Sequence, residues 1–159
     1  MSFLTPEQQA LALQIGEALA ARGETVAVAE STAGGLVSAA LLWVPGASRY
    51  FRGGGVFYTR QSRIAMAGMT QEQFEGYRGS TPENVAAMAE ALRARLDATW
   101  CIAEAGAAGP TGHAGRTVLA VAGPSARTEV FETQSSDREA NMVAFATRAL
   151  QLLRDALAS

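Results

Sequence analysis

Apolar positions along the chain follow two different spacings, which divide it into helices and strands. From Pro6 to Gly23 they recur every three or four residues, the spacing of an amphipathic helix. From Thr25 to Ala29 the chain is instead a short run of β-branched and small apolar residues, typical of a buried strand. The chain is therefore expected to open with a helix that leads into a strand.

The same two patterns, with capping, glycine and proline residues at the ends, predict the remaining elements. The sequence predicts a surface helix at 71–76, other helices at 36–44, 60–66, 81–97 and from Asp137 onward, and strands at 49–58, 99–105, 116–122 and 127–133. The glycines at 53–55 suggest a bulge or a close approach to a ligand, and the short turn at 123–126 predicts an antiparallel hairpin. With 159 residues the chain fits one domain, residues 1–159.

The segment from Glu30 to Gly35 joins the first predicted strand to a helix through a glycine-bearing turn. This geometry would expose Ser31 at the carboxyl end of the strand and present unpaired backbone N–H groups of the first helical turn. Such a corner can hold an anion or a developing oxyanion. The alternative is that Ser31 or Thr32 only caps the helix. Glu30 could orient a neighbour or lie solvated at the end of the strand.

A second glycine-rich segment, Gly106 to Gly115, follows the predicted strand at 99–105. If the strands run parallel, this loop lies at the same edge of the sheet as Ser31. It carries His113, the only histidine, which could act as a base near neutral pH or be an ordinary exposed loop residue. One histidine without a cluster of cysteines or carboxylates predicts no metal site.

Composition restricts the possible functions and chemistry. All 13 basic residues are arginines, so no lysine is present to serve as a neutral amine base, and arginine stays protonated in proteins. The net charge of −2 and the scattered arginines argue against nucleic acid as a partner. Cys101, the single cysteine, lies in an apolar run and is expected to be a buried thiol. Without a leader or a membrane-spanning run, we expect a soluble, cytoplasmic protein.

Several motifs in order along the chain resemble the CinA C-terminal-domain family, also described as competence/damage-inducible proteins. They are AESTAGG at 29–35, VPGAS followed by YF and GG at 44–54, Tyr58 with Arg63, STPENVAAMAE at 80–90 and AGAAGP at 105–110. Each motif is short, but together they cover nearly the whole chain. The resemblance implies an α/β fold, a three-layer α/β/α sandwich with a mixed sheet of about five to six strands. It also suggests the stand-alone form of the domain.

The resemblance further implies a nicotinamide-nucleotide amidohydrolase, which converts nicotinamide mononucleotide to nicotinate mononucleotide and ammonia without a cofactor. In this family a serine acts as nucleophile, assisted by a lysine and a tyrosine. Carried over to this chain, the catalytic positions are Ser31, Tyr58 and Arg63. The substrate-binding positions would be Glu30, Thr32, Ala33, Gly34, Gly35, Ala105, Gly106, Gly109 and Pro110. The expected partner is a small nucleotide, and the chain could form a homo-oligomer.

The chain departs from the family pattern at positions that matter for catalysis. Arg63 aligns with the family's lysine, Ala33 and Ala105 align with threonines, and Met142 aligns with an arginine of the final helix. An arginine can orient a hydroxyl or bind phosphate, but it cannot take a proton from serine at neutral pH. Without the resemblance, Arg63 would be interpreted as a surface charge and Tyr58 as an aromatic at the end of a strand.

Two hypotheses about function follow from these departures. In the first, the protein is an amidohydrolase with an altered base, such as His113, Glu30 or an activated water. In the second, it is a catalytically impaired nucleotide-binding or sensing protein that retains the pocket.

Overall fold

A computed structural model describes residues 1–159 as five helices, two short 3₁₀ segments and five strands. In chain order they are α1 (Pro6–Arg22), β1 (Val26–Glu30), α2 (Leu36–Trp43), η1 (Ala47–Arg49), β2 (Phe51–Val56), α3 (Arg60–Ala65), η2 (Glu72–Phe74), α4 (Pro82–Arg95), β3 (Trp100–Ala107), β4 (Arg116–Ala122), β5 (Arg127–Glu132) and α5 (Arg138–Ala158). None of these helices is both long and apolar enough to cross a bilayer.

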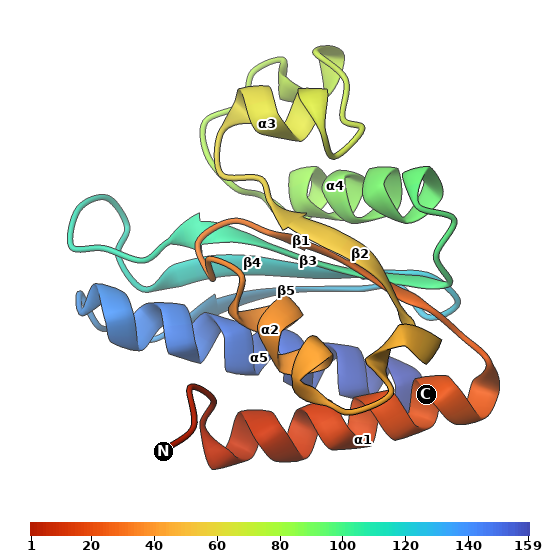
Figure 1. Ribbon diagram of the computed structural model, residues 1–159. Helices are drawn as coiled ribbons and strands as arrows, with labels where there is room; N and C mark the ends of the chain where they lie inside the picture. The colour runs from red at the N-terminus through yellow and green to blue at the C-terminus, as the bar shows by residue number, and fades with distance from the viewer.

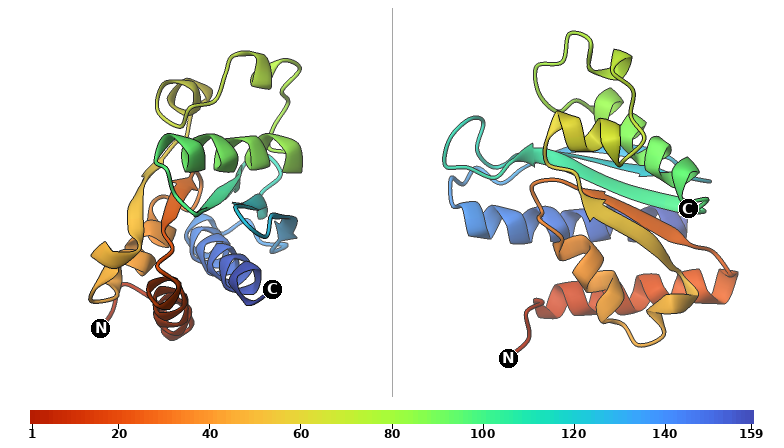
Figure 2. Two further views of the ribbon diagram at one scale, coloured as in Figure 1. Left: turned by 90° about the vertical axis from the view of Figure 1, so that its right-hand side faces the viewer. Right: turned by 45° about the horizontal axis from the view of Figure 1, so that its top comes forward.

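The strands form one mixed sheet in the order β2-β1-β3-β4-β5. β2, β1 and β3 run parallel, and β4 and β5 complete the sheet as an antiparallel hairpin. Helices α1, α2 and α5 cover one face of the sheet, whereas α3 and α4 lie on the other (Figures 1 and 2). The predicted three-layer α/β/α arrangement with a mixed sheet is therefore confirmed.

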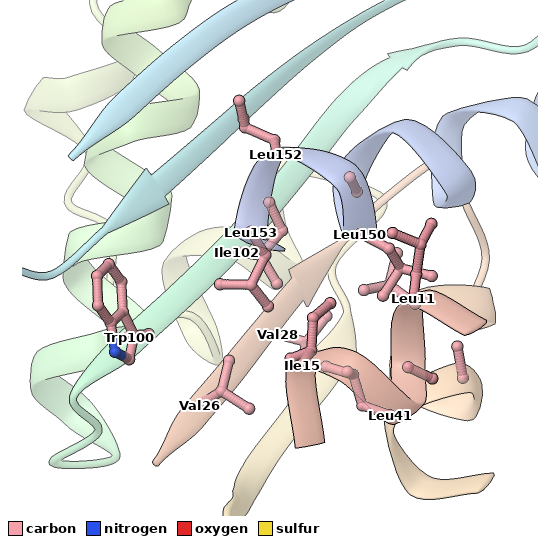
Figure 3. Packing of buried hydrophobic residues seen from close by; sticks show 14 of the residues in the cluster. Leu11, Ile15, Val26, Val28, Leu41, Trp100, Ile102, Leu150, Leu152 and Leu153 are labelled. Atoms are coloured by element: carbon pink, nitrogen blue, oxygen red, sulfur yellow. The ribbon is translucent and has the colours of Figure 1, made fainter. Parts of the chain in front are cut away.

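Two hydrophobic cores lie on opposite faces of the sheet, and they differ in the size of the strand residues that build them. On the face of α1, α2 and α5 the strands contribute large residues, including Val26, Val28, Trp100 and Ile102, as Figure 3 shows. On the face of α4 they contribute mostly alanines, from Ala27 in β1 to Ala122 in β4. Small side chains let a helix approach a sheet closely, so α4 packs directly on the strands that carry the candidate site.

The glycines of β2 lie at a bulge and at a close contact within the sheet. The register with β1 shifts between Val26 and Ala27, so Arg52 is the extra residue of a β-bulge. A side chain at Gly54 would lie 2.5 Å from the Val28 carbonyl oxygen, which excludes any larger residue at this position. The predicted bulge is therefore present, on an edge strand.

Most predicted boundaries fall within one or two residues of the observed ones, and two differences bear on the site. β1 includes Glu30, so this carboxylate belongs to the sheet. β3 extends through Gly106 and Ala107, so the glycine-rich loop starts at Ala108. The predicted surface helix at 71–76 is only the 3₁₀ segment η2, and its Phe74 is buried beneath Arg60 in a cation–π contact of 5.2 Å.

Candidate active site

Ser31 lies directly after β1, at the carboxyl end of the parallel strands, as predicted. The expectation that the turn exposes it is wrong, because only 3% of Ser31 is exposed. Its position is fixed by the buried carboxylate of Glu104 in the neighbouring strand β3. Glu104 Oε1 accepts hydrogen bonds from the backbone N–H groups of Ser31, at 3.2 Å, and Ala33, at 2.8 Å. Its Oε2 accepts from the hydroxyls of Thr32 and Thr117. Four donors around one carboxylate hold the turn rigidly against the sheet.

Glu30 caps helix α2 from within β1. Its carboxylate accepts hydrogen bonds from the backbone N–H groups of Gly35 and Val37, each at 3.0 Å, and of Ser38 at 2.8 Å. A carboxylate at a helix N-terminus satisfies orphan donors and complements the helix dipole. Burial raises the pKa of the Glu30 carboxyl, the bonds from Ser38 and Val37 oppose this, and the charge of Glu104 adds to the increase.

Three further expectations about this turn are therefore wrong. The first helical turn does not present unpaired N–H groups to an anion, because the Glu30 carboxylate already occupies that position. The alternative that Ser31 or Thr32 caps α2 is also wrong, since Gly35 is the N-cap residue and no side chain at that position caps the helix. A solvated Glu30 is excluded as well, because only 1% of this residue is exposed.

Arg63 is the cation at Ser31, and it is buried. Thr59 and Ser62 form a capping box that starts α3 and places Arg63 on its inner face. Its guanidinium donates from all three nitrogens: Nε to the Phe57 carbonyl at 3.0 Å, Nη1 to Tyr77 Oη at 3.2 Å and Nη2 to Ser31 Oγ at 3.2 Å. No carboxylate lies within 4.0 Å of it. Its interpretation as a surface charge is therefore wrong.

A cleft of about 960 Å³ opens in front of Ser31 and Arg63. It is bounded by the segment between η2 and α4, the first turn of α4 and the ends of β3 and β4, and also by Tyr58 and His113. Arg78 and Arg116 join Arg63 in its lining, and neither takes part in an ion pair. Its size falls in the range of pockets that hold a small-molecule ligand.

Only some of the predicted site residues line this cleft. Ser31, Tyr58, Arg63 and Gly106 do. The other predicted positions lie outside its lining: Glu30, Thr32, Ala33, Gly34, Gly35, Ala105, Gly109 and Pro110. Ala33 and Ala105 are fully buried in the two hydrophobic cores, on opposite faces of the sheet. Neither methyl group contacts the cleft, because each is enclosed by core side chains.

The start of the loop after β3, at Ala108 and Gly109, is tied to helix α5 and lies outside the cleft lining. The Ala108 carbonyl accepts a hydrogen bond from Asn141 Nδ2 at 2.8 Å, and the Gly109 carbonyl accepts one from Arg138 Nη1 at 2.5 Å. A side chain at Gly109 would lie 2.9 Å from the Ser136 carbonyl oxygen. The glycine at this position is therefore required for packing of the loop.

The tyrosine bonded to Arg63 is Tyr77, which sequence analysis missed. Its ring packs edge-on against Phe74 with a centroid distance of 5.1 Å, and its hydroxyl accepts from Arg63. Tyr58 lines the cleft but remains 57% exposed and makes no hydrogen bond to Ser31 or Arg63. No signal near Tyr77 identifies it, because the segment between η2 and α4 carries no motif.

His113 lies at the outer rim of the cleft. Its side chain is 70% exposed, and Nε2 lies 2.7 Å from the Glu132 carboxylate across the loop. It makes no hydrogen bond to Ser31 or Arg63. His113 therefore shares the cleft but is not part of the hydrogen-bonded group around the serine.

We expect Gly34→Ala to lower the free energy of unfolding by about 1–2 kcal/mol, because Gly34 has φ +69°, a left-handed conformation that side chains disfavour. Gly23→Ala is the matched control, with φ +65° and open space around the added methyl group. At Gly34 the methyl group would lie 2.8 Å from the flexible end of Met142, which can move away. Urea denaturation of both variants should give similar losses. A much larger loss for Gly34→Ala would show that Met142 is locked over the turn.

Comparisons with known proteins identify the family of this chain. The CinA C-terminal domain family model matches residues 8–157. The chain is 34% identical over 157 residues to a CinA-like protein of Desulforapulum autotrophicum, an alignment that covers 95% of this chain and 36% of that protein. It is 41% identical over 145 residues to a CinA-like protein of an Anaeromyxobacter species, covering 87% and 35% respectively. The chain thus spans about a third of the length of these curated relatives.

A solved structure extends the likeness to the whole fold. The competence/damage inducible protein CihA from Agrobacterium tumefaciens superposes with a TM-score of 0.89 at 27% sequence identity, with 100% of both chains covered. Since the family model spans nearly all residues and the fold is shared from end to end, this protein belongs to the CinA C-terminal domain family.

Proposed function

We propose that this protein binds nicotinamide mononucleotide in the cleft at Ser31 and hydrolyses its carboxamide slowly, with Ser31 as the nucleophile. The observation that carries this proposal is the hydrogen bond from the buried Arg63 guanidinium to Ser31 Oγ at the cleft. A serine held by a buried cation beside an open pocket is an arrangement suited to acyl transfer.

The charges of the cleft favour a phosphorylated ligand. Arg63, Arg78 and Arg116 line it, against the carboxylates of Glu75 and Glu83, although the chain as a whole carries a net charge of −2. Arg116 Nη1 donates to the Ser80 carbonyl at 3.0 Å, which leaves its other donors available. Arginine is well suited to phosphate because its planar guanidinium can donate two parallel hydrogen bonds.

Arg63 can stabilise the attacking serine oxygen, but it cannot act as the general base. As a fixed donor to Ser31 Oγ, it stabilises negative charge that develops on that oxygen. It cannot accept the serine proton, because a guanidinium stays protonated. Proton transfer to a positioned base contributes typically about 10² to 10⁴ in rate, so the replacement of the family's lysine by Arg63 is expected to slow turnover.

The second candidate function is a nucleotide-binding or sensing protein without turnover. One observation favours it: no carboxylate or imidazole makes a hydrogen bond to Ser31 Oγ. Glu30 and Glu104 are both engaged by backbone donors, and His113 is paired with Glu132. Ammonia release from nicotinamide mononucleotide distinguishes the two functions, because only the first produces it.

Binding itself is tested by calorimetry with nicotinamide mononucleotide and with its unphosphorylated riboside. We expect the nucleotide to bind more tightly, and Arg78→Gln to weaken it by roughly tenfold or more, since a hydrogen bond to a charged group contributes about 1.5–3 kcal/mol. Arg95→Gln is the matched control, because Arg95 is likewise exposed and lies away from the cleft. Equal affinity for nucleotide and riboside, or equal effects of the two variants, would contradict the proposed phosphate contact.

A further inference from the structure

We propose that Tyr77 is the general base for Ser31 in this protein, taking the position in the mechanism that the family assigns to lysine. This inference rests on the proposed function, which supplies the substrate. Among the residues of the chain, the proposed proton transfer itself involves only Ser31, Arg63 and Tyr77.

One guanidinium holds both oxygens. Arg63 Nη2 donates to Ser31 Oγ and Arg63 Nη1 donates to Tyr77 Oη, each at 3.2 Å. The third nitrogen, Nε, is anchored on the Phe57 carbonyl, so the guanidinium plane is fixed. Ser31 Oγ and Tyr77 Oη make no hydrogen bond to each other, so the proposed proton transfer between them runs through one bridging water. The ring of Tyr77 is held in place by Phe74.

The other groups able to accept a proton make no hydrogen bond to Ser31 Oγ or to the Arg63 guanidinium. Glu30 accepts from three backbone N–H groups of α2, and Glu104 accepts from four donors around the turn. The remaining titratable or charged groups that share the cleft are Tyr58, Glu75, Arg78, Glu83, His113 and Arg116. None of these makes a hydrogen bond to Ser31 or Arg63. Tyr77 is the one ionisable acceptor in contact with the Arg63 guanidinium.

Arg63 contacts both oxygens of the proposed proton transfer. A charge-assisted hydrogen bond from a guanidinium stabilises negative charge on the oxygen that accepts it. The Nη2 contact therefore stabilises the charge that develops on Ser31 Oγ as the serine loses its proton.

The proton balance of the reaction closes with these residues and water. A bridging water takes the Ser31 proton and passes one of its own to the Tyr77 phenolate as Ser31 Oγ forms a bond to the carboxamide carbon. The C–N bond then breaks, and the departing nitrogen takes the proton from Tyr77 Oη and leaves as ammonia. Water attacks the remaining ester and gives a proton to Tyr77. The bond between Ser31 Oγ and the acyl carbon breaks, Tyr77 returns the proton to Ser31 through the bridging water, and the nucleotide acid is released.

The test measures acylation of Ser31 with p-nitrophenyl acetate, an activated ester that does not require the nucleotide pocket. Intact-mass measurements follow acetylation of the protein, with Ser31→Ala as the blank. We expect the rate for the unaltered protein to rise from neutral to alkaline pH, because phenols ionise well above neutrality. Tyr77→Phe, which keeps the ring, should lower the rate at least tenfold and flatten the rise. Tyr58→Phe should have the smaller effect of the two.

Each outcome decides the proposal. An acylation rate and pH profile unchanged by Tyr77→Phe, or a larger loss for Tyr58→Phe, would overturn it, as would absence of Ser31 acylation at every pH. Circular dichroism of Tyr77→Phe shows whether a loss of rate reflects a loss of fold. Normal acylation by a partly unfolded Tyr77→Phe would also contradict the role of Tyr77 as the base. Calorimetry with nicotinamide mononucleotide is independent, since failure of binding there would contradict only the proposed function.

Discussion

Glu104→Ala should lower the free energy of unfolding by about 4 kcal/mol or more, a large fraction of the roughly 5–15 kcal/mol typical of a folded protein. The carboxylate is 1% exposed and accepts four hydrogen bonds. Its removal leaves the backbone N–H groups of Ser31 and Ala33 and two threonine hydroxyls without their acceptor. Each buried polar group left unpaired costs about 1–3 kcal/mol.

Urea denaturation followed by circular dichroism measures this loss, and two variants serve as controls. Glu104→Gln keeps one oxygen as an acceptor, and should therefore lose less than Glu104→Ala. Glu90→Ala removes an exposed carboxylate whose ion pair with Arg93 at 2.7 Å lies on the surface, so its effect should stay below about 1 kcal/mol. Equal stability of Glu104→Ala and Glu90→Ala would show that the buried carboxylate does not hold the turn.

Arg63→Lys should increase ammonia release from nicotinamide mononucleotide, by about 10² if the amine loses its proton in the buried site. Burial disfavours the charged form of lysine, and a neutral amine can accept the Ser31 proton. The gain is limited because lysine cannot reproduce all three contacts of the guanidinium, to Phe57, Tyr77 and Ser31. Steady-state ammonia release is the measurement, with Arg63→Gln as the variant that removes the charge without supplying a base. Equal rates for Arg63→Lys and Arg63→Gln would contradict this role.

Threonine at positions 33 and 105, which the family resemblance suggests, is not expected to add to that gain. Ala33 and Ala105 are both fully buried among core side chains. A larger residue in a well-packed core typically costs about 1–3 kcal/mol, and a hydroxyl placed there also needs a partner. Threonine at either position is therefore expected to lower the free energy of unfolding without raising ammonia release.

The architecture could be predicted because its signals are local. Thr5, Thr81 and Asp137 each accept a hydrogen bond from the third residue after them, as their positions ahead of apolar helical repeats indicated. The parallel pairing of β1 and β3 brought Ser31 and Gly106 to one edge of the sheet, as expected. Periodicity and capping were sufficient for these elements because adjacent residues determine them.

Most contacts inside the site could not be predicted, because residues distant in sequence make them. Glu104 reaches Ser31 and Thr32 across 73 and 72 positions, and Arg63 meets Ser31 across 32. The turn after β1 was expected to offer free N–H groups, since nothing in the sequence indicates that Glu30 turns back onto α2. Tyr77 was overlooked because it lies between two glycines in a segment without periodicity.

The most direct test of the central claim is ammonia release from nicotinamide mononucleotide by the unaltered protein and by Ser31→Ala, with binding of the nucleotide measured on both. The account predicts slow release by the unaltered protein and none above background for Ser31→Ala, with both proteins still binding the nucleotide. Release at the same rate from Ser31→Ala would show that Ser31 is not the nucleophile and would contradict the account.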